Sequence, residues 1–339
     1  MANVRNLAPA NAERHPGYDP VATLDPAILP YLDLLRRGAL PIATSTVDEL
    51  RAGARAVRAG WRDRAPAMHE TIDERFEGMR YRIYRPTAAE RPPAVIFFHG
   101  GGWTLMDIDT HDPIARLIAA ASGAAILSLD YPMAPEAPYP VAAEACTRFV
   151  RFVASEADRL RLAPHALALS GDSAGANLAV GVALRLSDAG AVRPSALGLI
   201  YGSYDLSTLG RDSHRRFGDG SLPLSIERMT FFRDSYVPAV PLRADPLVSP
   251  LHADLDGLPP AFLMVASHDA LYDENLLFAA RLGAAGASVE LKIYPGTIHG
   301  FIEAAAAVDA PVAKEAVADL GRFLARTLKL AAEGVPMIG

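Results

Sequence analysis

The chain has 339 residues, of which 50% are hydrophobic and 21% are charged, and its formal net charge is −6 at pH 7. These values are typical of a globular protein and exclude a largely disordered chain. The acidic balance, with no run of lysine and arginine among aromatic residues, argues against a nucleic-acid partner. The single cysteine, Cys146, lies in an apolar helical pattern and cannot form an internal disulfide, so we expect a buried thiol without a catalytic role.

No targeting or membrane segment is predicted. The first thirty residues mix charged residues, asparagines and prolines without an apolar core, so they do not resemble a secretory signal. The longest apolar stretch, residues 117–129, is interrupted by Ser122 and Gly123 and is too short to cross a bilayer. We therefore expect a soluble protein with no membrane span, located in the cytoplasm.

Two helices are predicted before the first strand, over 26–37 and, after a capping pattern at Thr46, over 50–59. From residue 68 the pattern changes to short strands, and beyond residue 94 apolar strands alternate with helices. The predicted strands cover 70–76, 79–84, 94–98, 124–129, 166–169, 196–201, 261–265 and 289–293, and the helices that alternate with them cover 113–121, 142–154, 174–188, 275–285 and 310–328. This alternation predicts an α/β fold with a mostly parallel sheet covered on both faces.

One connection is much longer than the others. About sixty residues separate the strands at 196–201 and 261–265, which is far more than such a loop needs. The segment contains several aromatic residues among arginines and is typical of an inserted helical element. We therefore divide the chain into four parts: an N-terminal helical segment (1–60), a core (61–204), an insertion (205–245) and the second part of the core (246–339).

A glycine-rich loop follows the strand at 94–98 and reads His99-Gly100-Gly101-Gly102-Trp103. Consecutive glycines allow backbone N–H groups to approach a substrate oxygen that side chains would otherwise block. We expect the N–H groups of Gly101 and Gly102 to stabilise an oxyanion, an interaction whose loss costs on the order of 10² to 10³ in rate per donor.

A second glycine-framed turn, Gly171-Asp172-Ser173-Ala174-Gly175, joins the strand at 166–169 to the next helix. The pattern Gly-x-Ser-x-Gly places a serine on a strained strand-to-helix turn, and the helix N-terminus favours negative charge beside it. A phosphate-binding loop is the alternative, but neither Gly-x-Gly-x-x-Gly nor Gly-Lys-Ser/Thr is present. The pattern predicts that Ser173 is a nucleophile and that the N–H of Ala174 is a third oxyanion donor.

A serine nucleophile needs a histidine base that an acid orients. Of nine histidines, His299 alone lies between the last strand and the last helix, where such a base is expected. Asp269 comes directly after the strand at 261–265 and is the preferred acid, whereas Asp205 follows the preceding strand and is the alternative. His268 is expected to pack or be solvated, and no paired Cys/His spacing predicts a metal site.

These motifs resemble the hormone-sensitive-lipase-like family of α/β-hydrolases, the bacterial esterases with a His-Gly-Gly-Gly signature. Residues 130–136 with Pro140, and residues 298–301, match the family as well, and the likeness extends over residues 68–330. Pro132-Met133 stands where the family usually has Arg-Leu, and Ala270 replaces a common proline; neither change removes a reacting group. The resemblance implies an α/β-hydrolase fold with a sheet of about eight strands, and a cap formed by the N-terminal helices and the 205–245 insertion.

Further residues are expected around the reacting groups. Contacts with the substrate are expected for Trp103, Asp172, Phe217, Phe231 and Phe232. Structural support for the site is expected from His99, Gly100, Glu136 and Asp273, with Glu136 bracing the oxyanion loop as the resemblance implies.

The sequence predicts a serine carboxylesterase that hydrolyses small esters with short- to medium-chain acyl groups through an acyl-enzyme, without cofactor or metal. Lactone or amide hydrolysis and acyl transfer use the same residues and are alternatives. A non-catalytic receptor for a small ligand on the same fold is less favoured, since serine, aspartate and histidine are all present. Family members often form dimers, so a homodimer is compatible with the resemblance.

Overall fold

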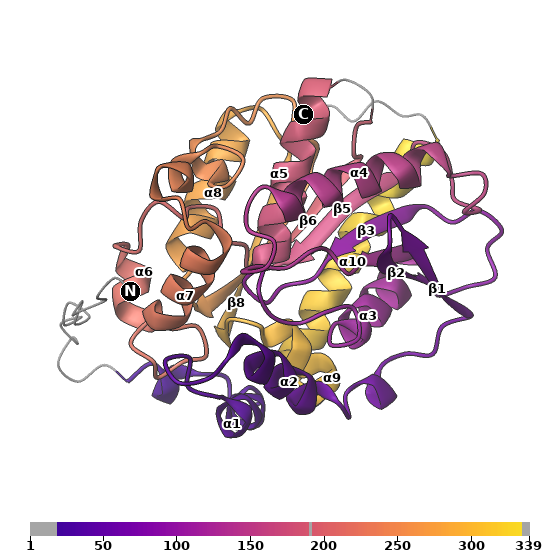
Figure 1. The fold of residues 1–339 in the computed structure, drawn as a ribbon. Coiled ribbons are helices and arrows are strands. Elements are labelled where there is room, and N and C mark those ends of the chain that lie inside the picture. The colour runs from indigo at the N-terminus through magenta and orange to yellow at the C-terminus, as the bar shows by residue number, and fades with distance from the viewer. Residues whose placement is uncertain (1–18, 190–191, 334–339) are drawn as a thin grey trace.

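The computed structural model describes residues 19–189 and 192–333, which form a central sheet flanked by helices (Figure 1). The strands are β1 (Glu70–Phe76), β2 (Met79–Arg85), β3 (Ala94–Phe98), β4 (Ala125–Leu129), β5 (Leu167–Asp172), β6 (Ala196–Ile200), β7 (Ala261–His268) and β8 (Val289–Ile298). The helices are α1 (Leu29–Gly38), α2 (Val47–Arg58), α3 (Asp112–Ser122), α4 (Val141–Ser155), α5 (Ala174–Ala189), α6 (Asp212–Phe217), α7 (Ile226–Tyr236), α8 (Tyr272–Ala284), α9 (Ala304–Ala307) and α10 (Pro311–Ala332). The beginning of the predicted 1–60 segment and the end of the 246–339 segment lie outside the described residues.

The eight strands form one sheet in the order β1-β2-β4-β3-β5-β6-β7-β8. The pairs β1/β2 and β2/β4 are antiparallel, and every other pair is parallel. The central strands are apolar on both sides because helices cover both faces of the sheet. The predicted α/β fold with a mostly parallel sheet of about eight strands is confirmed.

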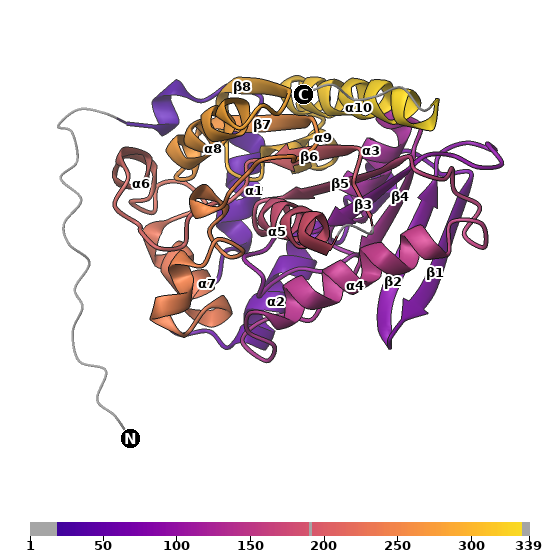
Figure 2. The ribbon, with the colours of Figure 1, turned by 90° about the horizontal axis from the view of Figure 1, so that it is seen from above.

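The two faces of the sheet bury separate apolar clusters. In β3, Ile96 packs with residues of α4 and α5 on one face, whereas Val95 and Phe97 pack with residues of α3 and α10 on the other. Figure 2 shows α4 and α5 on one side of the sheet and α10 on the opposite side. This alternation follows from the two-residue period of a strand, which sends successive side chains to opposite faces.

Two strands are longer than predicted, and both extensions approach the candidate site. β5 continues from the predicted end at residue 169 to Asp172, and β8 continues from residue 293 to Ile298. The predicted strand ended at residue 293 because Pro295 and Gly296 are typical of a loop. The strand nevertheless continues because β8 is an edge strand, where proline is tolerated, and because its pairing with β7 is irregular near Ala266.

The N-terminal helices and the 205–245 insertion lie at the same end of the molecule (Figures 1 and 2). The predicted cap of α2 is present, since the Thr46 hydroxyl accepts the Glu49 N–H and the Glu49 carboxylate accepts the Thr46 N–H at 2.8 Å. The insertion contains α6 and α7, as its aromatic residues indicated. Within the described part of the chain, none of the helices has both the length and the hydropathy that crossing a membrane requires.

Candidate active site

Ser173 occupies the turn between β5 and α5. Its backbone has a φ of 54°, in the left-handed region that non-glycine residues seldom adopt. The two flanking glycines are sterically required: a Cβ on Gly171 would lie 2.4 Å from the backbone of Gly175, and a Cβ on Gly175 would lie 1.9 Å from the carbonyl oxygen of Phe98. This close approach of strand and helix holds the serine hydroxyl at the carboxyl end of the sheet.

His299 and Asp269 meet Ser173 at this end of the sheet. His299 directly follows β8 and Asp269 directly follows β7, so parallel pairing brings them together. The distance from His299 Nε2 to Ser173 Oγ is 2.9 Å, and that from His299 Nδ1 to Asp269 Oδ2 is 2.7 Å. Asp269 is buried and also accepts the N–H of Leu271 at 2.9 Å. A hydroxyl, an imidazole and a carboxylate are therefore connected in one chain of hydrogen bonds.

The other candidates for base and acid have different partners. Asp205 forms ion pairs with Arg211 and His252. The ring of His268 contacts the hydroxyl groups of Thr23 and Ser267, each at 2.8 Å. Of the two acids considered from the sequence, Asp269 is the one in contact with His299.

The glycine loop presents unpaired backbone donors beside Ser173. Gly101 and Gly102 have φ values of 105° and 61°, and both line one cavity with Ser173. A Cβ on Gly102 would lie 2.1 Å from the Phe232 ring, so a larger residue does not fit there. Within residues 19–189 and 192–333, the N–H groups of Gly101, Gly102 and Ala174 donate to no protein acceptor. They are therefore free to bind an oxygen of a ligand.

A buried pair joins the serine turn to the glycine loop. Asp172 Oδ1 accepts the Gly100 N–H at 2.8 Å and lies 3.2 Å from His111 Nε2. Burial would lower the pKa of His111, but the neighbouring carboxylate outweighs that effect and raises it; His111 in turn holds the pKa of Asp172 below its usual range. Asp172 was predicted to contact the substrate, and it does line the larger cavity. Its carboxylate also holds the Gly100 N–H, an interaction that we call the Asp172 clamp. No pattern in the sequence singles out His111.

His99 is a buried, neutral histidine at the start of the loop. Its ring stacks on Tyr131 at 4.3 Å between centroids, and its Nδ1–H donates to the Gly100 carbonyl oxygen at 2.8 Å. Burial and the nearby His111 lower the pKa of His99 to about 4. His99 and Gly100, which were predicted as supports, are thus in contact with each other and with Tyr131 and Asp172.

The depressed pKa of His99 predicts a dependence of stability on pH. Between about pH 6.5 and pH 4 the unfolded chain binds a proton that the folded protein excludes, so the free energy of unfolding falls as the pH falls, by about 3 kcal/mol for this residue. Denaturant unfolding between pH 6.5 and pH 4 should show that the free energy of unfolding of His99→Gln decreases less with falling pH than that of the native protein. His165→Gln, which removes an exposed histidine, is the control and should keep the native slope; an equal slope for His99→Gln would contradict the prediction.

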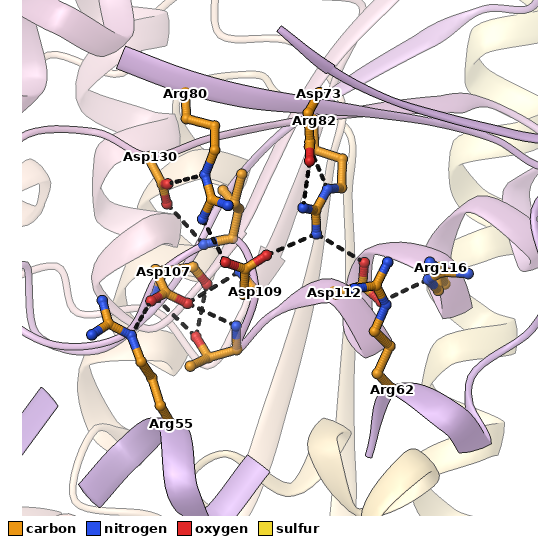
Figure 3. A network of polar contacts seen from close by, with 12 residues as sticks. Arg55, Arg62, Asp73, Arg80, Arg82, Asp107, Asp109, Asp112, Arg116 and Asp130 are labelled. Carbon is orange, nitrogen blue, oxygen red and sulfur yellow. Dashed lines mark hydrogen bonds and ion pairs between the residues drawn. The ribbon is translucent and has the colours of Figure 1, made fainter. Parts of the chain in front are cut away.

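Carboxylates hold the segment that follows the glycines (Figure 3). Asp107 pairs with Arg55 of α2 at 2.6 Å, and Asp130 accepts the Ile108 N–H at 2.9 Å while pairing with Arg80 of β2. The network continues through Asp73, Arg82, Asp109, Asp112, Arg62 and Arg116. Helix α2, strand β2 and helix α3 thus anchor a loop that has no regular structure of its own.

Two predicted supports make contacts between elements. Arg51 of α2 binds the Glu136 carboxylate through two hydrogen bonds of 2.8 Å and donates to the Thr104 carbonyl oxygen at 2.9 Å, so Glu136 braces the loop through this arginine. Asp273 lies in the first turn of α8 and accepts the Ser213 N–H of α6 at 2.9 Å. Asp273 therefore ties the insertion to the core.

Two cavities meet at Ser173. The larger, of about 340 Å³, also contains His299 and extends between α1, α2 and residues 220–232. The smaller, of about 40 Å³, lies on the Ala174 side and is lined by apolar residues that include Leu206, Leu209, Met229 and Leu271. Phe232 lines both cavities.

The predicted aromatic contacts differ in position. Trp103 lines the smaller cavity and stacks on Tyr236 at 4.5 Å between ring centroids. Phe217 instead packs against His268 in the core, and Phe231 packs beside the Phe232 ring. Neither Phe217 nor Phe231 lines these two cavities, because the turns of α6 and α7 direct them elsewhere, which the sequence did not reveal.

Comparisons with known proteins agree with this architecture. A family model described as the alpha/beta hydrolase fold matches residues 95–303. The chain is 36% identical to the carboxylesterase NlhH of Mycobacterium tuberculosis over 72% of this chain and 76% of that protein, and 30% identical to an acetyl esterase of Salmonella paratyphi B over 80% and 84%. A hyperthermophilic esterase of Pyrobaculum calidifontis superposes with a TM-score of 0.84 at 31% identity, over 90% of this chain and 98% of that one. The chain therefore belongs to the α/β-hydrolase fold family, among the esterases that resemble hormone-sensitive lipase.

Proposed function

We propose that this carboxylic ester hydrolase works through Ser173, His299 and Asp269 and forms an acyl-enzyme. The observation that carries the proposal is the pair of contacts on the His299 ring, 2.9 Å to the serine oxygen and 2.7 Å to the carboxylate. His299 accepts the hydroxyl proton as Ser173 attacks the ester carbon, and Asp269 stabilises the imidazolium that results. His299 then gives this proton to the leaving alcohol and afterwards activates the water that releases the acid.

The negative charge of the tetrahedral intermediate needs donors that are already in place. The free N–H groups of Gly101, Gly102 and Ala174 fit this role, because they lie beside Ser173 and have no other acceptor among the described residues. The Asp172 clamp on Gly100 keeps the glycine loop in register with the serine turn.

The two cavities have different roles in this mechanism. The leaving oxygen must lie within hydrogen-bond reach of His299, so the alcohol portion belongs in the larger cavity, which contains that residue. The acyl portion then enters the smaller cavity on the Ala174 side, whose 40 Å³ is enough for about three water-sized groups. This favours acyl groups up to about butyryl.

The N-terminal helices and the 205–245 insertion act as a cap in this proposal. Residues of both segments, such as Val57 and Leu224, line the larger cavity, and the Phe232 ring lies against Gly102. The cap excludes water from the reacting groups and limits the size of the substrate.

The proposal is tested with 4-nitrophenyl esters of increasing acyl length. The purified protein should hydrolyse the acetate and butyrate esters with a kcat/KM at least about 100-fold above that for the palmitate ester. Each methylene group that does not fit in the smaller cavity stays exposed and forgoes roughly 0.8 kcal/mol of hydrophobic binding energy. A preference for palmitate would contradict the acyl assignment.

A fluorophosphonate probe separates an enzyme from a receptor on the same fold. The probe should label the native protein at a single serine, and peptide mapping should identify it as Ser173. Ligand binding without labelling or ester turnover would favour the receptor.

A further inference from the structure

We infer that the alcohol portion of the natural substrate carries a carboxylate, and that the guanidinium of Arg228 binds it. This inference rests on the proposed function, since it names the class of ester that the same site would take. The observation behind it is a cationic side chain that lies in the larger cavity and takes no part in the proposed reaction.

Arg228 lies in the first turn of α7 and lines the larger cavity together with Ser173 and His299. Its side chain is half-buried, and its guanidinium carbon is 5.9 Å from the centre of the Phe232 ring. The same ring lies against Gly102 of the glycine loop. One aromatic ring therefore separates the cation from the groups that would hold the ester carbonyl.

The guanidinium of Arg228 has no acceptor in the described part of the chain, residues 19–189 and 192–333, where it forms neither a side-chain hydrogen bond nor an ion pair. Other half-buried arginines of the region are paired, Arg51 with Glu136 and Arg233 with Asp234. Burial and the charge of Arg58 lower the pKa of Arg228, so the folded protein bears a cost for this cation. An anionic ligand would offset that cost.

The remaining buried charges of the larger cavity are neutralised within the protein. Arg58 binds Glu303 through three contacts of 2.7 to 3.0 Å, and Tyr31 donates to the same carboxylate at 2.8 Å. Asp172 is engaged by His111 and by the glycine loop. Arg228 is therefore the half-buried charge that has no paired partner among the described residues lining the cavity.

Two exposed charges lie at the outer part of the same cavity. Arg36 donates to the neutral Ser221 carbonyl oxygen at 2.7 Å and, among residues 19–189 and 192–333, pairs with no carboxylate. Glu227, which precedes Arg228, is exposed and forms no ion pair with it. Among the described residues that line the cavity, Arg36 and Arg228 are therefore the two arginines that pair with no carboxylate.

A carboxylate on the alcohol portion fits this arrangement. The leaving alcohol lies on the His299 side, in the cavity that contains Arg228, whereas the smaller acyl cavity is mainly apolar near Ser173. The planar guanidinium presents parallel N–H donors that match the two oxygens of a carboxylate. The substrates are therefore esters of hydroxy acids in which the acyl group is small and the free acid lies some bonds from the ester oxygen.

The test compares 6-acetoxyhexanoate with 6-acetoxyhexanamide, which differ in charge but have the same acyl group and chain. We expect the native protein to have the higher kcat/KM for the carboxylate, mainly through a lower KM. In Arg228→Gln, the ratio of kcat/KM for the carboxylate substrate to kcat/KM for the amide substrate should fall by about 10- to 100-fold. A loss of this size is expected when a charge-assisted hydrogen bond is removed. Arg228→Lys should recover part of the ratio, and added salt should lower it in the native protein.

Arg215→Gln is the matched control, because it removes an arginine of the insertion that is already paired with Asp212 and lines neither cavity. Its ratio should equal the native ratio. If the native protein hydrolyses 4-nitrophenyl acetate but Arg228→Gln has the same carboxylate-to-amide ratio of kcat/KM as the native protein, this inference is overturned and the proposed function is not. No turnover of any of the three esters by the native protein overturns the proposed function, and this inference with it. Thermal unfolding of each variant shows whether the fold is retained.

Discussion

Replacing Ser173 by alanine is expected to lower kcat for 4-nitrophenyl acetate by roughly 10⁴- to 10⁶-fold while the protein stays folded. The hydroxyl oxygen is the atom that would bond to the ester carbon, and no neighbouring group can replace it. Alanine also carries a Cβ, so it adds no new backbone strain at the positive φ of this turn. Initial rates and a thermal unfolding curve measure the two parts of the prediction.

Ser170→Ala is the matched control for the loss of a hydroxyl. Ser170 lies on β5, the strand that leads into the turn of Ser173, is buried, and donates to the Gly198 carbonyl oxygen at 2.7 Å. The variant should lose stability, by about 1 kcal/mol, and keep most of its turnover. Turnover of Ser173→Ala within about 10-fold of the native protein would refute the assignment of the nucleophile.

Asp269→Asn is expected to lower kcat by roughly 10³- to 10⁴-fold. An amide in this position does not stabilise the imidazolium of His299, and its NH₂ group favours the ring tautomer with the proton on the wrong nitrogen. Steady-state kinetics with the acetate ester measures the loss, which should appear in kcat more than in KM.

Asp205→Asn discriminates between the two acids that the sequence offers. The Asp205 carboxylate is engaged by Arg211 and His252, so its replacement should change kcat by less than about 10-fold. A large loss in Asp205→Asn together with a small loss in Asp269→Asn would reverse the assignment of the acid.

The reacting groups could be located from the sequence because each follows a recognisable strand. Ser173 lies in a local pattern whose glycines are needed for a close approach of strand and helix. His299 and Asp269 are not held by such a close approach of glycines, but parallel strands end at the same edge of a sheet, so residues that follow them converge. The position of Asp269 directly after its strand already favours it over Asp205 in the sequence, and the structure adds that Asp269 contacts His299 whereas Asp205 pairs with Arg211 and His252.

The groups that surround the triad could not be predicted in the same way. His111 reaches Asp172 across 61 positions and Arg58 reaches Glu303 across 245, and nothing local in the sequence marks such partners. The aromatic residues of the insertion show the same limit: Phe232 faces the site and Phe231 does not. Neighbouring residues of a helix point in different directions, and which of them meets the cavity depends on how the helix packs.

The sequence by itself determined the class of fold, and it predicted that Ser173 and His299, which follow different strands, would meet at one end of the sheet. Those features depend on local periodicity and on turns that only certain residues can form. Only the tertiary structure decided the size of the two cavities, the clamp between Asp172 and the glycine loop, and the isolation of Arg228 in the larger cavity. Each of these depends on distances between segments remote in the chain, which are set by packing and by the pairing of buried charges.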